Sequence, residues 1–243
     1  MRMLTFAKRN TKEIIRDPLT VAFGLGFPLV LLLLLSAIQA NVPVSLFEIS
    51  QLTPGITIFG LSFMTLFSAT LIAKDRGSSL LQRLYTTPLT PIDFILGYTL
   101  PIIPFAVAQS IICYIVALCL GLDLTLNILF AVVFIIPISV LFIAFGLLFG
   151  SILSDKQVGG ICGALLTNLC AWLSGTWFDL ELVGGVFKKV AYALPFVHAV
   201  EMERALLEGS FVDIFPHLWW VIGYAIVALG IAISLFLRQM KKQ

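Results

Sequence analysis

Residues 124–154 read LTLNILFAVVFIIPISVLFIAFGLLFGSILS, a stretch that contains no charged side chain. An α-helix rises about 1.5 Å per residue, so about 20 residues cross a hydrocarbon core roughly 30 Å thick. This stretch exceeds that length. It also lacks the alternation of polar and apolar residues that marks a strand of a transmembrane barrel. We therefore predict a transmembrane helix here.

Similar charge-free stretches occur along the rest of the chain. The 243 residues are 60% hydrophobic and 12% charged, with a mean hydropathy of +1.06. A soluble core of this size could not hide so much apolar surface, so part of it must face lipid. We expect an all-α integral membrane protein with a single transmembrane domain over residues 1–243. Its six spans are expected at about 19–40, 54–73, 95–121, 126–151, 157–177 and 217–237.

The positive charges fall mainly on one side when six spans are threaded with the N-terminus inside. Twelve of the 15 Lys and Arg residues then lie on the inner side, and only Lys188, Lys189 and Arg204 lie outside. Because cytoplasmic loops carry an excess of Lys and Arg, both termini are predicted to be cytoplasmic. The net charge of +2 reflects this topology and does not suggest a nucleic-acid partner.

The N-terminal arm, residues 1–17, mixes apolar and basic side chains. This pattern predicts an amphipathic helix on the cytoplasmic leaflet, with a solvated basic tail as the alternative. The chain is expected to turn into the bilayer at Asp17 and Pro18. A cleaved signal peptide is disfavoured because the charged arm before the first span is unusually long.

The loop after the second span, residues 75–90, is longer than an ordinary connector and carries helix caps. Gly77 is expected to end the second span. Ser79 and Gln82 offer a capping box, and Pro88 stops the short helix that follows. Thr90, with Asp93 three residues later, predicts the N-cap of the third span.

The predicted short helix in this loop has an apolar face and also displays Arg83. Its apolar residues are Leu80, Leu81, Leu84 and Tyr85. We interpret this face as a surface that presses against another protein. The alternative is a helix that merely lies on the membrane.

The segment before the last span, residues 179–216, is long and predicted to be external. Pro195 can start a helix that Gly209 ends. The charged residues on its polar side are Glu201, Arg204 and Glu208. A re-entrant or interfacial helix is favoured over a solvated loop because an apolar side would face the membrane or the ends of the spans. That side consists of Phe196, Ala199, Val200 and Leu206.

Several kinds of chemistry are excluded by the sequence. No Lys is followed by Ser or Thr, so the phosphate-binding loop of nucleotide hydrolases is absent. The four cysteines lack metal-ligand spacing, and no catalytic or metal site is predicted on this chain. The interiors of the predicted spans lack Asp, Glu, Lys and Arg, which argues against ion-driven transport by this chain alone.

Several motifs resemble the ABC-2 type permeases, the membrane subunits of type V ABC exporters. They are IIRDP at 14–18, DRG at 75–77, TPLTP at 87–91 followed by Gly97, and ALPFVHAVEMERALLEG at 193–209. The resemblance covers essentially the whole chain. Two departures occur: Tyr98 stands where a Lys often follows the glycine, and Leu80-Leu81 replace the usual Leu-Glu.

The resemblance implies roles for the segments that do not span. The N-terminal arm would be a connecting helix, residues 75–90 a coupling helix on a separate ATPase subunit, and residues 179–216 a re-entrant external hairpin. ATP and Mg would bind the partner, and two permease subunits, as a homodimer, would assemble with two ATPases. The implied coupling residues are Asp75, Arg76, Gly77, Leu80, Leu81, Arg83, Leu84 and Tyr85, and those of the external segment are Pro195, Glu201 and Arg204.

The same resemblance implies a translocation path along the second and fifth spans. The residues concerned are Phe59, Phe63, Met64, Phe67, Asn168 and Trp172. Plain core or lipid packing is the alternative for the aromatic residues. The predicted function is export of a small amphipathic drug, antibiotic or peptide across a bacterial or archaeal cell membrane. The alternatives are export of a polysaccharide or lipid-linked glycan and, from another class, an intramembrane enzyme or signalling subunit.

Overall fold

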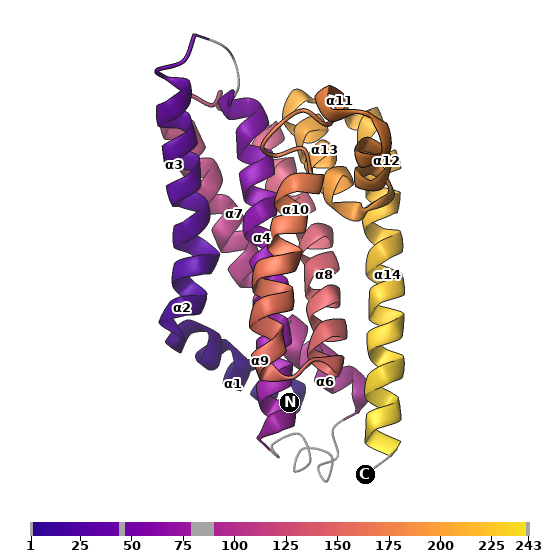
Figure 1. Cartoon of the computed structure of the whole chain (residues 1–243). Helices are drawn as coiled ribbons and strands as arrows, with labels where there is room; N and C mark the ends of the chain where they lie inside the picture. Colours follow the sequence, from indigo (N-terminus) through magenta and orange to yellow (C-terminus); the bar gives the residue numbers. More distant parts are fainter. Residues whose placement is uncertain (1, 44–46, 79–89, 242–243) are drawn as a thin grey trace.

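The computed structural model describes residues 2–43, 47–78 and 90–241, and these residues form helices and turns with no strand. Long helices lie side by side in a bundle (Figure 1). Both ends of the chain lie at the same end of the bundle, which we call the terminal end. The opposite end is called the far end.

The N-terminal arm forms an amphipathic helix, as predicted. Helix α1 (Arg2–Arg16) lies across the terminal end (Figure 1). The chain then turns at Asp17, whose side chain caps α2 (Pro18–Val21), in agreement with the expected turn into the first span. A π-helical stretch, η1 (Ala22–Gly26), leads into α3 (Phe27–Gln39).

The central helix is α4 (Ile49–Gly77), and most of its residues are buried. It packs most extensively against α8 (Asn127–Ile152). Gly146 and Gly150 of α8 permit this approach, because a Cβ at Gly150 would lie 2.9 Å from the carbonyl oxygen of Ala69. Helix α4 ends at Gly77, as predicted, about one turn beyond the apolar span expected at 54–73.

The third predicted span forms one candidate membrane crossing, Ile92–Cys119, with an interruption in its helix. It is divided into α6 (Pro91–Thr99) and α7 (Ile102–Cys119) at Pro101. Proline has no backbone N–H and cannot continue the hydrogen-bond ladder of the preceding turn. The start of α6 is as predicted, since Thr90 and Asp93 form a reciprocal capping box.

The expected fifth span forms a helix with a π-helical middle. It comprises α9 (Asp155–Val158), η2 (Gly159–Leu166) and α10 (Thr167–Leu173), which together run along the bundle beside α4 (Figure 1). Its first residues are polar and its last helical residue precedes the predicted end at 177.

The expected external segment folds into three helices at the far end (Figure 1). These are α11 (Leu180–Val183), α12 (Gly185–Ala193) and α13 (Pro195–Glu208). Helix α13 starts at Pro195, as predicted. It also ends where predicted, because Gly209 has φ +78° and closes it. It packs against α4, α8 and α14 (Phe211–Lys241), so its apolar side is buried inside the bundle.

Five helical segments of the described chain are long and apolar enough to cross a membrane, so this is a multi-pass membrane protein. They are Pro18–Gln39, Ile49–Gly77, Ile92–Cys119, Asn127–Ile152 and Phe211–Arg238. The predicted span at 157–177 is not one of them. Its helix is shorter and begins with the polar residues Asp155, Lys156 and Gln157.

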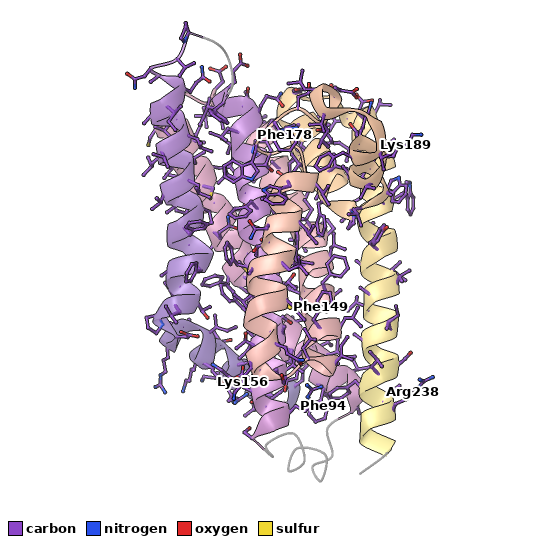
Figure 2. The ribbon with its side chains drawn as sticks, in the orientation of Figure 1. Phe94, Phe149, Lys156, Phe178, Lys189 and Arg238 are labelled. Atoms are coloured by element: carbon purple, nitrogen blue, oxygen red, sulfur yellow. The ribbon has the colours of Figure 1, made fainter. Side chains whose placement is uncertain are left out.

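The charge distribution predicts that the terminal end faces the cytoplasm. Lys156 lies at this end and Lys189 at the far end (Figure 2). In a cysteine-free background, we expect Lys189→Cys in intact cells to react with an impermeant thiol reagent. We expect Lys156→Cys to react only after permeabilisation. Labelling of Lys156→Cys but not Lys189→Cys in intact cells would invert the predicted orientation.

Candidate functional site

A bidentate ion pair joins α1 to the last turns of α4 at the terminal end. Arg9 donates from Nη1 to Asp75 Oδ2 at 2.6 Å and from Nη2 to Asp75 Oδ1 at 2.7 Å. Tyr98 of α6 donates its hydroxyl to the same carboxylate at 2.9 Å. Asp75 is 1% exposed, so these charge-assisted bonds replace its lost hydration. We call Arg9, Asp75 and Tyr98 the terminal clamp.

Packing around the terminal clamp fixes α1 against α6. Phe6 lies edge-on to Phe94 and Tyr98, with ring centroids 5.8 and 5.0 Å apart. Gly97 makes this contact possible, since any Cβ there would collide with the Phe6 ring. Asn10 is buried and donates from Nδ2 to the Gly97 carbonyl oxygen at 2.9 Å. The motif glycine is therefore required by a close approach of α1.

Arg76 connects the same end of α4 to the end of α8. Its guanidinium donates to the carbonyl oxygens of Ser151 and Leu153. These carbonyls lie at the helix C-terminus, where a cation is favoured. Asp75, Arg76 and Gly77 therefore form the last turn of α4, so the loop predicted at 75–90 starts after Gly77.

The remaining predicted coupling residues lie outside the described part of the chain. They are Leu80, Leu81, Arg83, Leu84 and Tyr85. The coupling interpretation of these residues stays a prediction.

A row of aromatic rings runs along α4 towards the far end. Phe59, Phe63 and Phe67 lie one turn apart, with successive centroids 5.7 and 6.5 Å apart. The ring centroids of Phe23 and Phe63 lie 5.9 Å apart, and those of Phe27 and Phe59 lie 6.0 Å apart. Thus η1 and α3 cover the row. Each ring of the row is no more than 7% exposed. We call Phe59, Phe63 and Phe67 the aromatic row.

The other predicted path residues do not join the aromatic row. Met64 is fully buried, and it has no ring to extend the row. Asn168 is exposed and donates from Nδ2 to the Ala164 carbonyl oxygen of its own helix at 2.8 Å. Trp172 is 55% exposed. Asn168 and Trp172 therefore face outward from this chain.

Arg204 holds the predicted external segment in place at the far end. It donates to Glu201 Oε1 at 2.8 Å and to the Gly175 carbonyl oxygen at 2.9 Å. It also reaches the Gln51 carbonyl oxygen at 3.4 Å. Pro195 starts α13 and is buried. The predicted residues Pro195, Glu201 and Arg204 all lie on α13, and of these the structure pairs Glu201 with Arg204. Arg204 also ties this helix to the start of α4 and to Gly175, just after α10.

Glu203 is a buried acid that the sequence analysis did not single out. Tyr114 of α7 donates its hydroxyl to Glu203 Oε2 at 2.7 Å. Among the described residues, the second oxygen, Oε1, has no hydrogen-bond partner. Burial raises the pKa of the Glu203 carboxyl to about 8, although the Tyr114 hydrogen bond opposes the shift. The sequence did carry one signal for this buried acid: Glu203 does not share the polar helical face of Glu201 and Arg204.

The described residues contain no cluster of three or more His, Cys, Asp or Glu side chains suited to a metal ion. Comparison with known families supplies a match over most of the chain: the model of the ABC-2 type transporter covers residues 1–207. A search of curated proteins found no match. The matched region includes α1, the central helix α4 and nearly all of α13. The chain therefore belongs to the ABC-2 type transporter family of membrane permeases.

Proposed function

We propose that the chain is the permease subunit of an ABC exporter that moves a small amphipathic molecule, such as a drug, antibiotic or peptide, out of the cell. ATP and Mg would bind a separate ATPase subunit, the usual partner of this family. In this proposal the protein has six spans, with Asp155–Leu173 as the core of the fifth, and its termini are cytoplasmic. Its location is a bacterial or archaeal cell membrane.

The terminal clamp is the observation that carries this proposal. It ties together α1, α4 and α6, and residues 79–89 connect α4 to α6. A force applied to that connection would reach α4 directly through the chain. It would then pass to α1 through Arg9 and to α8 through Arg76. An ATPase docked there could thus move the helix that carries the aromatic row.

A second copy of the chain would complete the path. The outward side of η2 and α10 exposes Leu165, Asn168 and Trp172. A large apolar ring and an amide on an exposed face suit an interface or a shared cavity better than contact with lipid alone. The apolar aromatic row favours an amphipathic cargo over a polysaccharide, whose path would require more hydroxyl groups.

Leu84 tests the predicted contact with the ATPase. If Leu84 is a central anchor, Leu84→Ala should cost about 2 kcal/mol, or roughly 30-fold in affinity for the ATPase. We expect weaker co-purification of the ATPase subunit, and loss of transport in reconstituted vesicles. Leu124→Ala is the matched control, because Leu124 is 83% exposed and lies between α7 and α8. A folded Leu84→Asp variant that keeps a stoichiometric ATPase and full transport would contradict the coupling role.

A further inference from the structure

A groove of about 920 Å³ opens at the terminal end between α1, α2 and α4. Basic side chains dominate its charge. Five cations line it against the two carboxylates of Glu13 and Asp17. The cations are Lys8, Arg9, Lys12, Arg16 and Lys74.

Both carboxylates already have partners. Glu13 forms an ion pair with Arg9 at 2.7 Å. Asp17 caps α2 and accepts a hydrogen bond from the Thr20 hydroxyl at 3.0 Å. Arg9 is itself held by Asp75 in the terminal clamp. The other four cations make no ion pair within the described part of the chain. The groove thus concentrates positive charge that a bound anion would neutralise.

Apolar surface borders this charge. Phe67 and Leu71 of α4 line the inner wall of the groove. Leu19, which is 66% exposed, lies at its edge, and Leu4 and Ile15 are 60% and 63% exposed on α1. Helix α1 therefore buries one apolar side against the protein while it exposes a second one. An exposed apolar surface beside lysines suits an interfacial helix in contact with acyl chains and headgroups.

The groove lies where the first candidate span begins, at Pro18. A ligand there would be at the depth of lipid headgroups. We propose that the groove binds the headgroup of an anionic phospholipid, with its phosphate among Lys8, Lys12 and Lys74 and its acyl chains beside Leu19. A soluble anion would use the same lysines but would gain nothing from the exposed leucines. Occupancy would hold α1 against α4 next to the terminal clamp.

The test uses the purified full-length chain in detergent and dioleoylphosphatidylglycerol as the probe, with bound lipid counted by native mass spectrometry. Lys12→Gln/Lys74→Gln removes one cation from each wall of the groove. Each basic residue near a membrane surface strengthens anionic lipid binding about fivefold. We therefore expect the apparent Kd to rise about 30-fold.

Two control variants separate this groove from general surface charge. Lys156→Gln/Arg238→Gln removes two exposed cations at the same end of the bundle but outside the groove (Figure 2). We expect a change of less than about threefold. Lys12→Arg/Lys74→Arg keeps the charge and should keep the affinity. Circular dichroism and gel filtration check folding, and Lys12→Gln alone, with an expected loss of about fivefold, replaces the double variant if that variant misfolds.

Four results would overturn the proposal. Equal losses in the groove variant and in Lys156→Gln/Arg238→Gln would show that only overall charge matters. Equally tight binding of dioleoylphosphatidylcholine would show that the anionic headgroup is not recognised. Displacement of the lipid by millimolar inorganic phosphate would identify a soluble-anion site. An unchanged Kd in Lys12→Gln/Lys74→Gln would exclude the groove as well.

Discussion

Arg9→Ala is expected to destabilise the protein by about 3 kcal/mol. The substitution leaves the buried Asp75 carboxylate without its main counter-charge, and such a loss usually costs 3–5 kcal/mol. We take about 3 kcal/mol, the lower end of that range, because the Arg9 side chain is 38% exposed and partly screened by solvent. A change of this size should lower the Tm in detergent by roughly 6–12 °C.

A second substitution identifies the cause of this loss. Asn at position 75 carries no charge, so Asp75→Asn should recover part of the Tm in the Arg9→Ala background. Glu13→Gln is the matched control, because Glu13 is the other acidic partner of Arg9. The Glu13 side chain is 35% exposed. That control should cost less than about 1 kcal/mol. A double variant no more stable than Arg9→Ala would mean that the buried charge is not responsible.

Local signals in the sequence predicted the ends of several helices, including Gly77 at the end of α4, but not the long-range contacts made there. Thr90 with Asp93, Pro195 and Gly209 act within one helical turn, and the structure has them as predicted. Asp75, by contrast, is satisfied by a residue 66 positions earlier. The sequence therefore assigned Asp75 to a loop, although its pairing with Arg9 keeps it helical and buried.

The candidate site was predictable to a similar degree. The phenylalanines of α4 were found because the family resemblance places the second span beside the translocation path, whereas the ring contacts that cover them come from η1 and α3. Tyr98 was noted only as a departure from a family pattern, yet its hydroxyl completes the terminal clamp. Glu203 was missed because its partner, Tyr114, lies 89 residues away in the sequence. Residue spacing carries no information on such pairs.

Glu203 should make the stability of the protein fall as the pH rises. Its pKa is about 8 in the folded chain against an ordinary value of 4.5. Between these values the folded state keeps a proton that the unfolded chain has released, so stability decreases with increasing pH. The stabilisation is fully present below about pH 4.5, is lost progressively up to about pH 8 and is then constant. The full loss is on the order of 5 kcal/mol.

Glu203→Gln removes this dependence because the amide stays neutral at every pH. We expect the variant and the parent to have similar Tm values near pH 5, and the variant to be more stable by at least about 10 °C at pH 8 to 9. The measurement is thermal unfolding in detergent across this pH range. Glu201→Gln is the control on the same helix. Its carboxylate is 33% exposed and paired with Arg204, so the slope of the parent should persist.

Tyr114→Phe tests the partner of Glu203. Without the hydroxyl, neither oxygen of the carboxylate keeps a hydrogen-bond donor, so the pKa of Glu203 should rise further. The decline in Tm should then extend above pH 8. Because Tyr114 belongs to α7 and Glu203 to α13, this extension would also show that the two helices stay in contact when the acid ionises. Parallel pH profiles for the parent and Glu203→Gln would refute the assignment of Glu203 as the titrating group.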